Sequence, residues 1–412
     1  MTRPFHDELL ILPSLTAHRS QQGELMLTQK FINGVAQFAV DWPGDVSALV
    51  RTSDSPTSDM DHVEAPAHSS KLRFEIRPPE LDGLRNRIHH AAAVLAFLSP
   101  FEVQTAKLCA ELNVPLIFWS EFSPKTEGQI VDAETKNYLI RLRRRLWIFQ
   151  AERKRRRMIK LAAGIQCSGI PAYNAYRNFN QNAMLFFDNR VPQQDVIDAS
   201  SLGVKIQAML QNRPLRLVFG GRLVAMKGVM HLPMVADKLR QLGVDFQLDI
   251  YGDGVLREAL MRDIAARGLD QCSALRGVLN FEREWIPRLK AEADLFVCCH
   301  PQGDPSSTYP EVMSCGVPIV GYANEAFAGI VEQSGSGWLS PINDPSALAQ
   351  VIARLAGDRA ELTRGALKAH EFAETHCFER TFHKRSRHLV SLSRLSGKIH
   401  HPDPTQLQDF GE

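Results

Sequence analysis

The sequence predicts an α/β protein in which two Rossmann-like domains face each other across a cleft. Its 412 residues are too many for one small core and suggest two domains. Apolar runs of strand length alternate with amphipathic helical stretches, which is the pattern of a parallel sheet covered by helices on both faces. A glycine bend follows the apolar run at 215–219. Ligands of such sheets bind at the carboxyl ends of the strands.

The first half of the chain begins with a strand-like run and a helix expected near 24–38. A strand–helix–strand unit follows, because two apolar runs flank a helical stretch that reaches Leu112. The strand-like runs of this half are ELLILPS, AAAVLAFLS, PLIFWSE, GIQCSG and AMLFFD.

The second half shows the same alternation of strand-like and helical stretches. Asp344-Pro345-Ser346 predicts the start of a helix, because an acid before a proline suits a helix N-terminus. A last helix is expected from about Glu361 onward. The strand-like runs are LRLVFGG, FQLDIYG, CSALRGV, DLFVCCH and VPIVGY.

These elements divide the chain into a Rossmann-like domain at 1–200 and a second at 201–375, with the segment 193–214 around the junction. A C-terminal helix and a disordered tail are expected at 376–412. The segment 53–70 is rich in Ser, Asp, His and Pro and predicts a mobile loop.

Composition indicates a cytoplasmic protein with an uneven charge. The net charge is +2, yet ten Lys and Arg residues and one acid give the segment 141–160 a charge of +9 and leave −7 for the rest. The N-terminus lacks the basic, apolar and small order of a signal peptide. No apolar run approaches the ~20 residues of a membrane-spanning helix. Seven cysteines without paired spacing indicate reduced, buried thiols rather than a disulfide framework.

The glycine bend is the first candidate site. Gly220 and Gly221 follow an apolar run, where glycine lets the backbone turn tightly and approach a phosphate. Arg222 and Lys227 come next and can reach the same anion. Fixed cations stabilise the negative charge that grows on a departing diphosphate. The alternative is a surface turn with two solvated cations.

Glu311 is the second candidate. It begins an apolar helix behind a loop of small polar residues at 304–308. A carboxylate there can accept two hydrogen bonds from ribose hydroxyls, as the acid of dinucleotide-binding folds does. Free N–H groups of the loop add affinity for anions. The alternative is an acid that only favours the helix N-terminus electrostatically.

Together, the blocks GGRLVAMKG, IYGDG, YPEVMSCGVPIVGY and GSGWLSPINDPSALAQVI resemble the donor domain of the family 4 (group 1) retaining glycosyltransferases, which have the GT-B fold. The resemblance covers about 215–355, while the N-terminal half matches only in its strand–helix rhythm. It implies transfer of a hexose from a nucleotide diphosphate sugar to a glycan or lipid-linked acceptor hydroxyl, with retention, in polysaccharide or glycolipid assembly. The N-terminal domain would bind the acceptor, and neither a metal nor another cofactor is expected.

The resemblance also implies roles for individual residues. Arg222 and Lys227 would hold the donor diphosphate, and Glu311 the ribose. The other donor-side residues that it implies are Gly221, Gly252 and Gly254, which leave room for the nucleotide, and Ser307 and Thr308, which present their backbone to phosphate and sugar.

The chain departs from the family pattern in two places. Gly303 stands where the family has a second glutamate, so either Asp304 takes its role toward the donor sugar or donor recognition differs. Glu121 stands where many members have a histidine facing the reacting sugar. A carboxylate there could stabilise an oxocarbenium-like transition state, or it is only an acid at a strand end. Gly23 lies where the family often has a glycine-rich loop and is carried over as an acceptor-side residue.

His300 and the pair Asp59 and Asp61 are further candidates for ligand contacts. His300 follows an apolar run, which places it near the cleft as a donor contact or as a structural residue. Asp59 and Asp61 resemble a paired-acid metal motif, but they stand in the loop at 53–70 rather than at a strand end, and we expect no metal there.

The basic segment Arg141–Lys160 is the third candidate region. At helical pitch Leu142, Leu146 and Phe149 share one face with cations beside it, so the helix could lie on an anionic membrane surface at the inner face of the membrane. The alternative is a core helix with a solvated basic face. Nucleic-acid binding is not expected, because no recognised motif accompanies the charge.

Two other functions remain open. A nucleotide-sugar epimerase or hydrolase on the same fold would act without an acceptor. A non-enzymatic, membrane-binding protein with a degenerate donor site would account for the glycine at 303.

Overall fold

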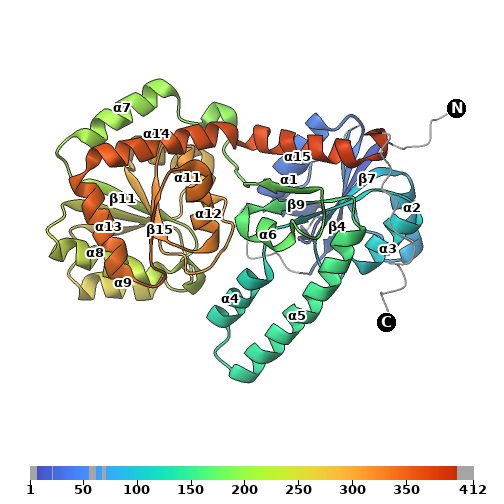
Figure 1. Ribbon diagram of the computed structural model, residues 1–412, viewed down its shortest axis with the longest axis horizontal. Helices are drawn as coiled ribbons and strands as arrows, with labels where there is room; N and C mark the ends of the chain where they lie inside the picture. The colour runs from blue at the N-terminus through green and yellow to red at the C-terminus, as the bar shows by residue number, and fades with distance from the viewer. Residues whose placement is uncertain (1–6, 21, 55–61, 67–70, 397–412) are drawn as a thin grey trace.

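A computed structural model describes residues 7–20, 22–54, 62–66 and 71–396. Two lobes lie side by side, each built around a sheet (Figure 1). The expected fold class of two Rossmann-like domains is confirmed. The expected tail after Lys398 and the pair Asp59 and Asp61 fall outside the described residues, as does most of the loop at 53–70. Within that loop, His62–Glu64 forms a short strand.

The first lobe contains a sheet of ten strands in the order β10-β9-β8-β7-β1-β4-β2-β3-β5, with β6 also paired to β4. The pairs β2–β3 and β3–β5 are antiparallel, and the others are parallel. The strands are β1 (Glu8–Leu12), β2 (Thr16–Arg19), β3 (Leu25–Thr28), β4 (Val46–Thr52), β5 (His62–Glu64), β6 (Leu72–Ile76), β7 (Ala91–Phe97), β8 (Leu116–Ser120), β9 (Gly164–Ser168) and β10 (Ala183–Phe186).

Helices cover both faces of this sheet because successive strand residues point to opposite sides. Leu9 and Ile11 pack in one apolar core with α1 and α15, while Leu10 and Leu12 pack in another with α2, α3, α5 and α6. The helices are α1 (Gln29–Asp41), α2 (Leu81–His89), α3 (Val103–Glu111), α4 (Pro124–Glu134), α5 (Tyr138–Leu161) and α6 (Gly169–Tyr176).

The predicted start of the helix near 24–38 is wrong. Leu25–Thr28 forms β3, which pairs with β2 and β5, and the helix begins at Gln29. The Thr28 side chain caps it by accepting a hydrogen bond from the Phe31 amide. The four residues of β3 are too few to show a period of two, so pairing with distant strands decides their conformation.

The second lobe contains a parallel sheet of six strands in the order β13-β12-β11-β14-β15-β16. All five strands expected in this half are present, and Trp338–Ser340 adds a sixth at the edge. The strands are β11 (Leu215–Gly220), β12 (Phe246–Tyr251), β13 (Ser273–Gly277), β14 (Leu295–Cys298), β15 (Ile319–Tyr322) and β16 (Trp338–Ser340).

One continuous apolar core joins the sheet of the second lobe to its helices. Asp344 accepts a hydrogen bond from the Ala347 amide at 2.8 Å, so the predicted start of this helix is confirmed. The helices are α7 (Ala199–Leu210), α8 (Leu232–Gln241), α9 (Arg257–Ala266), α10 (Ile286–Glu292), α11 (Thr308–Met313), α12 (Glu325–Ser334), α13 (Pro345–Gly357) and α14 (Arg359–Thr375).

The C-terminal helices connect the two lobes. Instead of one helix from about Glu361, the chain forms α14 and then α15 (Phe378–Leu392), which runs along the first lobe (Figure 1). Phe382 of α15 packs edge-on against Phe38 with ring centroids 5.0 Å apart. Arg385 is buried and donates to Gln166 at 2.9 Å. Burial lowers the pKa of Arg385 to about 10.

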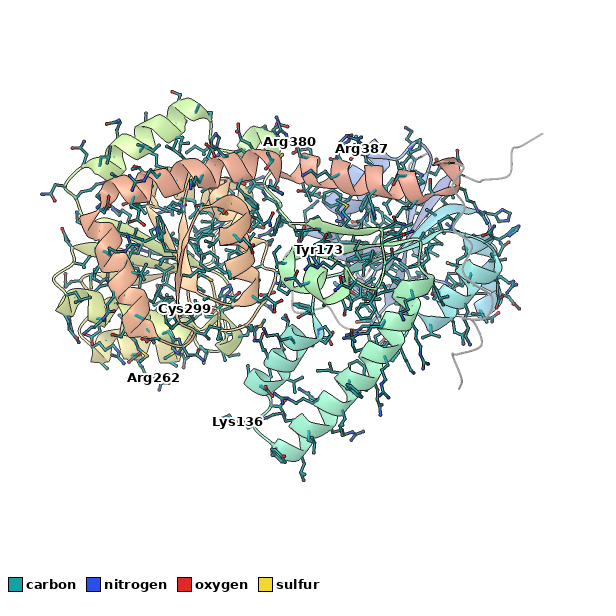
Figure 2. All side chains as sticks on the ribbon, in the orientation of Figure 1. Lys136, Tyr173, Arg262, Cys299, Arg380 and Arg387 are labelled. Atoms are coloured by element: carbon teal, nitrogen blue, oxygen red, sulfur yellow. The ribbon has the colours of Figure 1, made fainter. Side chains whose placement is uncertain are left out.

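Helices α4 and α5 form a hairpin that projects from the body of the molecule (Figure 1). Figure 2 shows Lys136 at the far end of this hairpin. The first half of α5 is exposed, whereas Ala151, Met158 and Ile159 in its second half are buried. No helix within the described part of the chain is both long and apolar enough to cross a membrane.

Gly228 fixes the turn that follows β11. Its φ is +62°, which costs a residue with a side chain roughly 1–2 kcal/mol. A Cβ at this position would also overlap the carbonyl oxygen of Cys299, at the end of the neighbouring strand β14. The turn can therefore approach β14 only because residue 228 has no side chain.

We expect Gly228→Ala to lower the free energy of unfolding by about 3 kcal/mol or more, because backbone strain adds to a steric clash. Gly243→Ala is the matched control, since Gly243 has a φ of +71° but nothing within 4 Å of an added Cβ. It should cost only about 1–2 kcal/mol. Urea unfolding measures both variants, and equal losses would contradict the clash.

Candidate functional site

Lys227 and Asp304 form an ion pair at the carboxyl end of the second sheet. Lys227 lies in the turn after β11, and Asp304 lies in the loop after β14. The Lys227 Nζ and the Asp304 Oδ2 atoms are 2.6 Å apart, and both side chains are largely buried. The structure thus brings together two of the predicted site residues. It also gives the lysine a carboxylate partner in the absence of a ligand.

The glycine bend precedes Lys227 in the turn after β11. Arg222, which follows the bend, is exposed. A Cβ at Gly252 would overlap the carbonyl oxygen of Gly221, and one at Gly254 would meet the Leu223 carbonyl oxygen at 2.6 Å. The turns after β11 and β12 therefore touch backbone to backbone. This packing requires both glycines even without a ligand.

Glu311 is almost completely buried in the first turn of α11. Its side chain is 3% exposed, and the Nε and Nη2 atoms of Arg190 donate to its two carboxylate oxygens at 2.6 and 3.3 Å. The Arg190 guanidinium also lies over the ring of Phe281, 3.9 Å from the centroid. Arg190 could not be predicted from the sequence, because this residue stands in a polar segment after β10 that carries no motif.

The loop before α11 faces the first lobe. A small recess is lined by Ser168, Gly169 and Asp188 on the side of the first lobe and by Pro305, Ser306 and Tyr309 of the second. The Ser306 hydroxyl donates to Thr308 Oγ1 at 3.0 Å. The Ser307 carbonyl oxygen accepts a hydrogen bond from the Glu311 amide at 3.1 Å. The predicted residues Ser307 and Thr308 therefore lie beside the interdomain recess.

Helix α4 of the first lobe holds the backbone of Gly303. The Thr126 hydroxyl donates to the Gly303 carbonyl oxygen at 3.0 Å, and Gln129 Oε1 accepts from the Gly303 amide at 3.1 Å. Lys125 of the same helix lies 3.2 Å from Glu325 of the second lobe. These contacts could not be recognised from the sequence, because they join residues more than 170 positions apart.

Glu121 follows β8 and belongs to a second charged group at the lobe boundary. Lys30 Nζ lies 2.5 Å from Asp188 Oδ2. Burial and the carboxylates of Asp188 and Asp304 raise the pKa of Glu121, although Lys30 and Arg385 oppose the shift. Glu121 and Lys30 are both exposed, so solvent screens part of these interactions.

In the ion pair of Lys30 and Asp188, both pKa values shift in the direction that favours the charged forms. Burial opposes the charge on Lys30, but the carboxylates of Asp188 and Glu121 outweigh it and raise its pKa. Burial likewise opposes the charge on Asp188, and Lys30 and Arg385 nevertheless lower its pKa. Glu311 also contributes to the field at Lys30. The charge of Asp304 thus acts on Glu121, and the charges of Glu121 and Glu311 act on Lys30.

The remaining candidates lie at different depths. His300 is buried, and its Nδ1 atom is 3.4 Å from the hydroxyl of Tyr309, so a structural role accounts for its surroundings. Burial and then Lys227 hold the pKa of His300 well below its ordinary value. Gly23 is exposed in the turn between β2 and β3, where its carbonyl oxygen accepts from Arg19 at 2.6 Å. Among the described residues, no group of three or more His, Cys, Asp or Glu could hold a metal ion.

Comparison with known proteins identifies the second lobe. Residues 214–358 match the family described as Glycosyl transferases group 1. The amylovoran biosynthesis glycosyltransferase AmsK of Erwinia amylovora is 30% identical over 185 residues, which are 43% of this chain and 45% of that protein. The chain spans less than half the length of the curated relatives that it matches.

Solved structures extend the similarity to the fold of both lobes. Anabaena Alr3699/HepE in complex with UDP has a TM-score of 0.63 at 15% identity, covering 93% of this chain and 99% of that one. WaaG, a glycosyltransferase involved in lipopolysaccharide biosynthesis, has a TM-score of 0.60 at 14% identity, covering 92% and 99%. At these identities the likeness is one of fold. The protein therefore has the GT-B fold, and its residues 214–358 are similar to the group 1 glycosyltransferases.

Proposed function

We propose that this protein transfers a sugar, a hexose by the family pattern, from a nucleotide diphosphate sugar to an acceptor hydroxyl with retention of configuration. The observation that carries the proposal is the ion pair of Lys227 and Asp304 at the carboxyl ends of parallel strands, with Glu311 in the helix that follows the loop of Asp304. The charge of Asp304 acts on Glu121 of the first lobe. In sheets of this kind, that edge is where ligands bind.

Charge stabilisation is the proposed contribution of Lys227. When the bond between sugar and diphosphate breaks, negative charge grows on the diphosphate, and a fixed cation favours that state over the ground state. Lys227 is held in place by Asp304, and Arg222 of the same turn is exposed. A phosphate that approaches Lys227 competes with Asp304, whose carboxylate would then be available to hydroxyls of the donor sugar. We propose that this pair of cations acts without a metal.

Glu121 is the proposed residue of the first lobe that faces the reacting sugar. An ionised carboxylate beside a sugar that develops oxocarbenium character lowers the energy of that state. The raised pKa of Glu121 indicates that the protein disfavours its charged form. A positively charged transition state would compensate this cost, which is differential binding of the transition state.

The acceptor is proposed to bind to the first lobe, in polysaccharide or glycolipid assembly. AmsK acts in amylovoran biosynthesis and WaaG in lipopolysaccharide biosynthesis, and both support this class. We also propose that α5 contacts an anionic membrane surface at the inner face of a membrane. Its exposed apolar side chains are 44–72% accessible and stand beside the cations of 141–160. They are Tyr138, Leu139, Ile140, Leu142, Leu146, Trp147 and Phe149.

Turnover of nucleotide sugars tests the proposal. We expect release of a nucleoside diphosphate only when a nucleotide sugar and an acceptor from a lipid or glycan extract are both present. Lys227→Ala should lower kcat about 10²–10³-fold, because it removes a cation from the leaving group. Lys238→Ala on α8 is the control and should leave kcat unchanged. Equal turnover by Lys227→Ala would remove Lys227 from the mechanism, and acceptor-independent turnover would favour an epimerase or a hydrolase.

Binding to vesicles tests the proposed role of α5. We expect Trp147→Asn with Phe149→Asn to weaken binding to vesicles of phosphatidylglycerol and phosphatidylcholine by roughly tenfold or more, because two large apolar side chains no longer enter the interface. The control is Val204→Asn with Leu210→Asn on α7, where the apolar side chains are also exposed. A cosedimentation assay measures both variants, and equal binding by the α5 variant and the wild type would sink the proposal.

The pKa of Glu121 predicts a trade between stability and activity. Because this pKa is raised in the folded protein, the stability linked to its proton is present below the unfolded value of about 4.3 and is lost as the pH rises through the folded value. Glu121→Gln should therefore become increasingly more stable than the wild type as the pH rises from about 4, while its turnover falls.

Thermal unfolding across this pH range measures the effect. Glu332→Gln, on the exposed surface of α12, is the control and should show no such dependence. A stability difference for Glu121→Gln that shrinks with rising pH would contradict the assigned direction of the shift.

A further inference from the structure

Arg190 is held in one position from two sides. Its guanidinium forms two hydrogen bonds to the carboxylate of Glu311 and lies on the face of Phe281. Arg190 follows β10 and stands in the segment that leads from the first lobe into the second. Its neighbour Asn189 donates to Ser314 Oγ at 3.1 Å and to the His376 carbonyl oxygen at 2.9 Å. The backbone that carries Arg190 is thus fixed to the second lobe beside α11.

The two hydrogen bonds from Arg190 determine which acceptor positions of the Glu311 carboxylate remain open to other donors. An ionised carboxylate has about four acceptor positions on its two oxygens. The fork of Arg190 uses one position on each oxygen and leaves one on each. Two adjacent hydroxyls of a pentose need two acceptor positions side by side. Because the arginine fixes the plane of the carboxylate, the unused positions have a defined direction.

Arg190 also supplies the charge partner that a buried carboxylate needs. A buried carboxylate without a partner is costly, and Glu311 is only 3% exposed. Arg190 is 34% exposed, so it links the buried acid to the side open to solvent.

We propose that Arg190 is a positioning residue of the donor site, which orients Glu311 so that it accepts both hydroxyls of the donor's ribose. The inference rests on the proposed function and adds a residue that the family pattern did not supply. Arg190 acts through Glu311, so its loss should affect the recognition of the ribose hydroxyls rather than that of the diphosphate.

A second ion pair provides a matched control. Arg213 donates to both oxygens of Asp294 at 2.7 and 2.9 Å, with exposures of 29% and 2% that resemble those of Arg190 and Glu311. Arg213 and Asp294 precede β11 and β14, at the amino ends of these strands and away from the proposed donor site. Replacing Arg213 leaves the buried carboxylate of Asp294 without its arginine, and this reproduces in the same lobe the structural cost that replacing Arg190 has for Glu311.

The test compares ribose and dideoxyribose nucleotides. Calorimetry measures the Kd of UDP, GDP and ADP and of their 2′,3′-dideoxy forms for the wild type, Arg190→Met, Arg190→Lys and Arg213→Met. For the best-bound base, the wild type should prefer ribose by on the order of tenfold or more, because two hydrogen bonds to a charged group are lost without the hydroxyls. Arg190→Met should reduce this preference to about threefold or less, with little change in the Kd of the dideoxy form.

The variants separate positioning from stability. Arg190→Lys keeps a cation and should restore part of the ribose preference, whereas Arg213→Met should lower the melting temperature and leave the preference intact. If Arg190→Met keeps the wild-type preference, or if Arg213→Met loses it equally, the inference is wrong while the proposed function stands. If the wild type binds none of the nucleotides, the proposed function fails and the inference fails with it.

Discussion

The region between the two lobes is governed by one constraint, which is that a charge removed from water needs a partner. Three ion pairs satisfy it: Glu311 with Arg190, Asp304 with Lys227, and Asp188 with Lys30. Each of these charges has a partner within the protein. Binding of the proposed donor would exchange partners: phosphate oxygens would replace a carboxylate on Lys227, and hydroxyls would fill the open acceptor positions of Glu311. An exchange of this kind keeps buried charges compensated at every stage.

The fold explains why these pairs gather in one place. Lys227 and the loop with Asp304 follow parallel strands, and the carboxyl ends of parallel strands lie at the same edge of a sheet. Arg190 and Asp188 come from the segment that joins the lobes, and they pair with opposite lobes. Helix α15 then returns to the first lobe, where Arg385 contributes to the field around Glu121. The chain therefore crosses the boundary twice, and both crossings carry charges of the site.

Sequence reasoning predicted the parts of the site that follow strong strands. Lys227 and Glu311 can be predicted as candidates because apolar runs, a glycine bend and the start of a helix are local patterns. Arg190 was not found, since its partner is 121 positions away and nothing in the neighbouring residues indicates a pair. The same reason explains the missed strand β3, whose pairing partners decide its conformation. Local periodicity predicts elements, whereas contacts between distant segments need the folded chain.

Gly303 stands where the family has a glutamate, and it is also a point of contact between the two lobes. A Cβ at this position would lie in ordinary van der Waals contact with Thr126 and Glu325, at 3.4 Å from each. Thr126 and Gln129 hold the Gly303 backbone through its carbonyl oxygen and its amide. Helix α4 packs in turn on α5, where Arg155 forms two hydrogen bonds to Glu127. The loop that carries Asp304 is therefore held by the hairpin that ends in the exposed apolar and basic surface. Helix α5, helix α4 and the backbone of Gly303 therefore connect that surface to the loop of Asp304, the partner of Lys227.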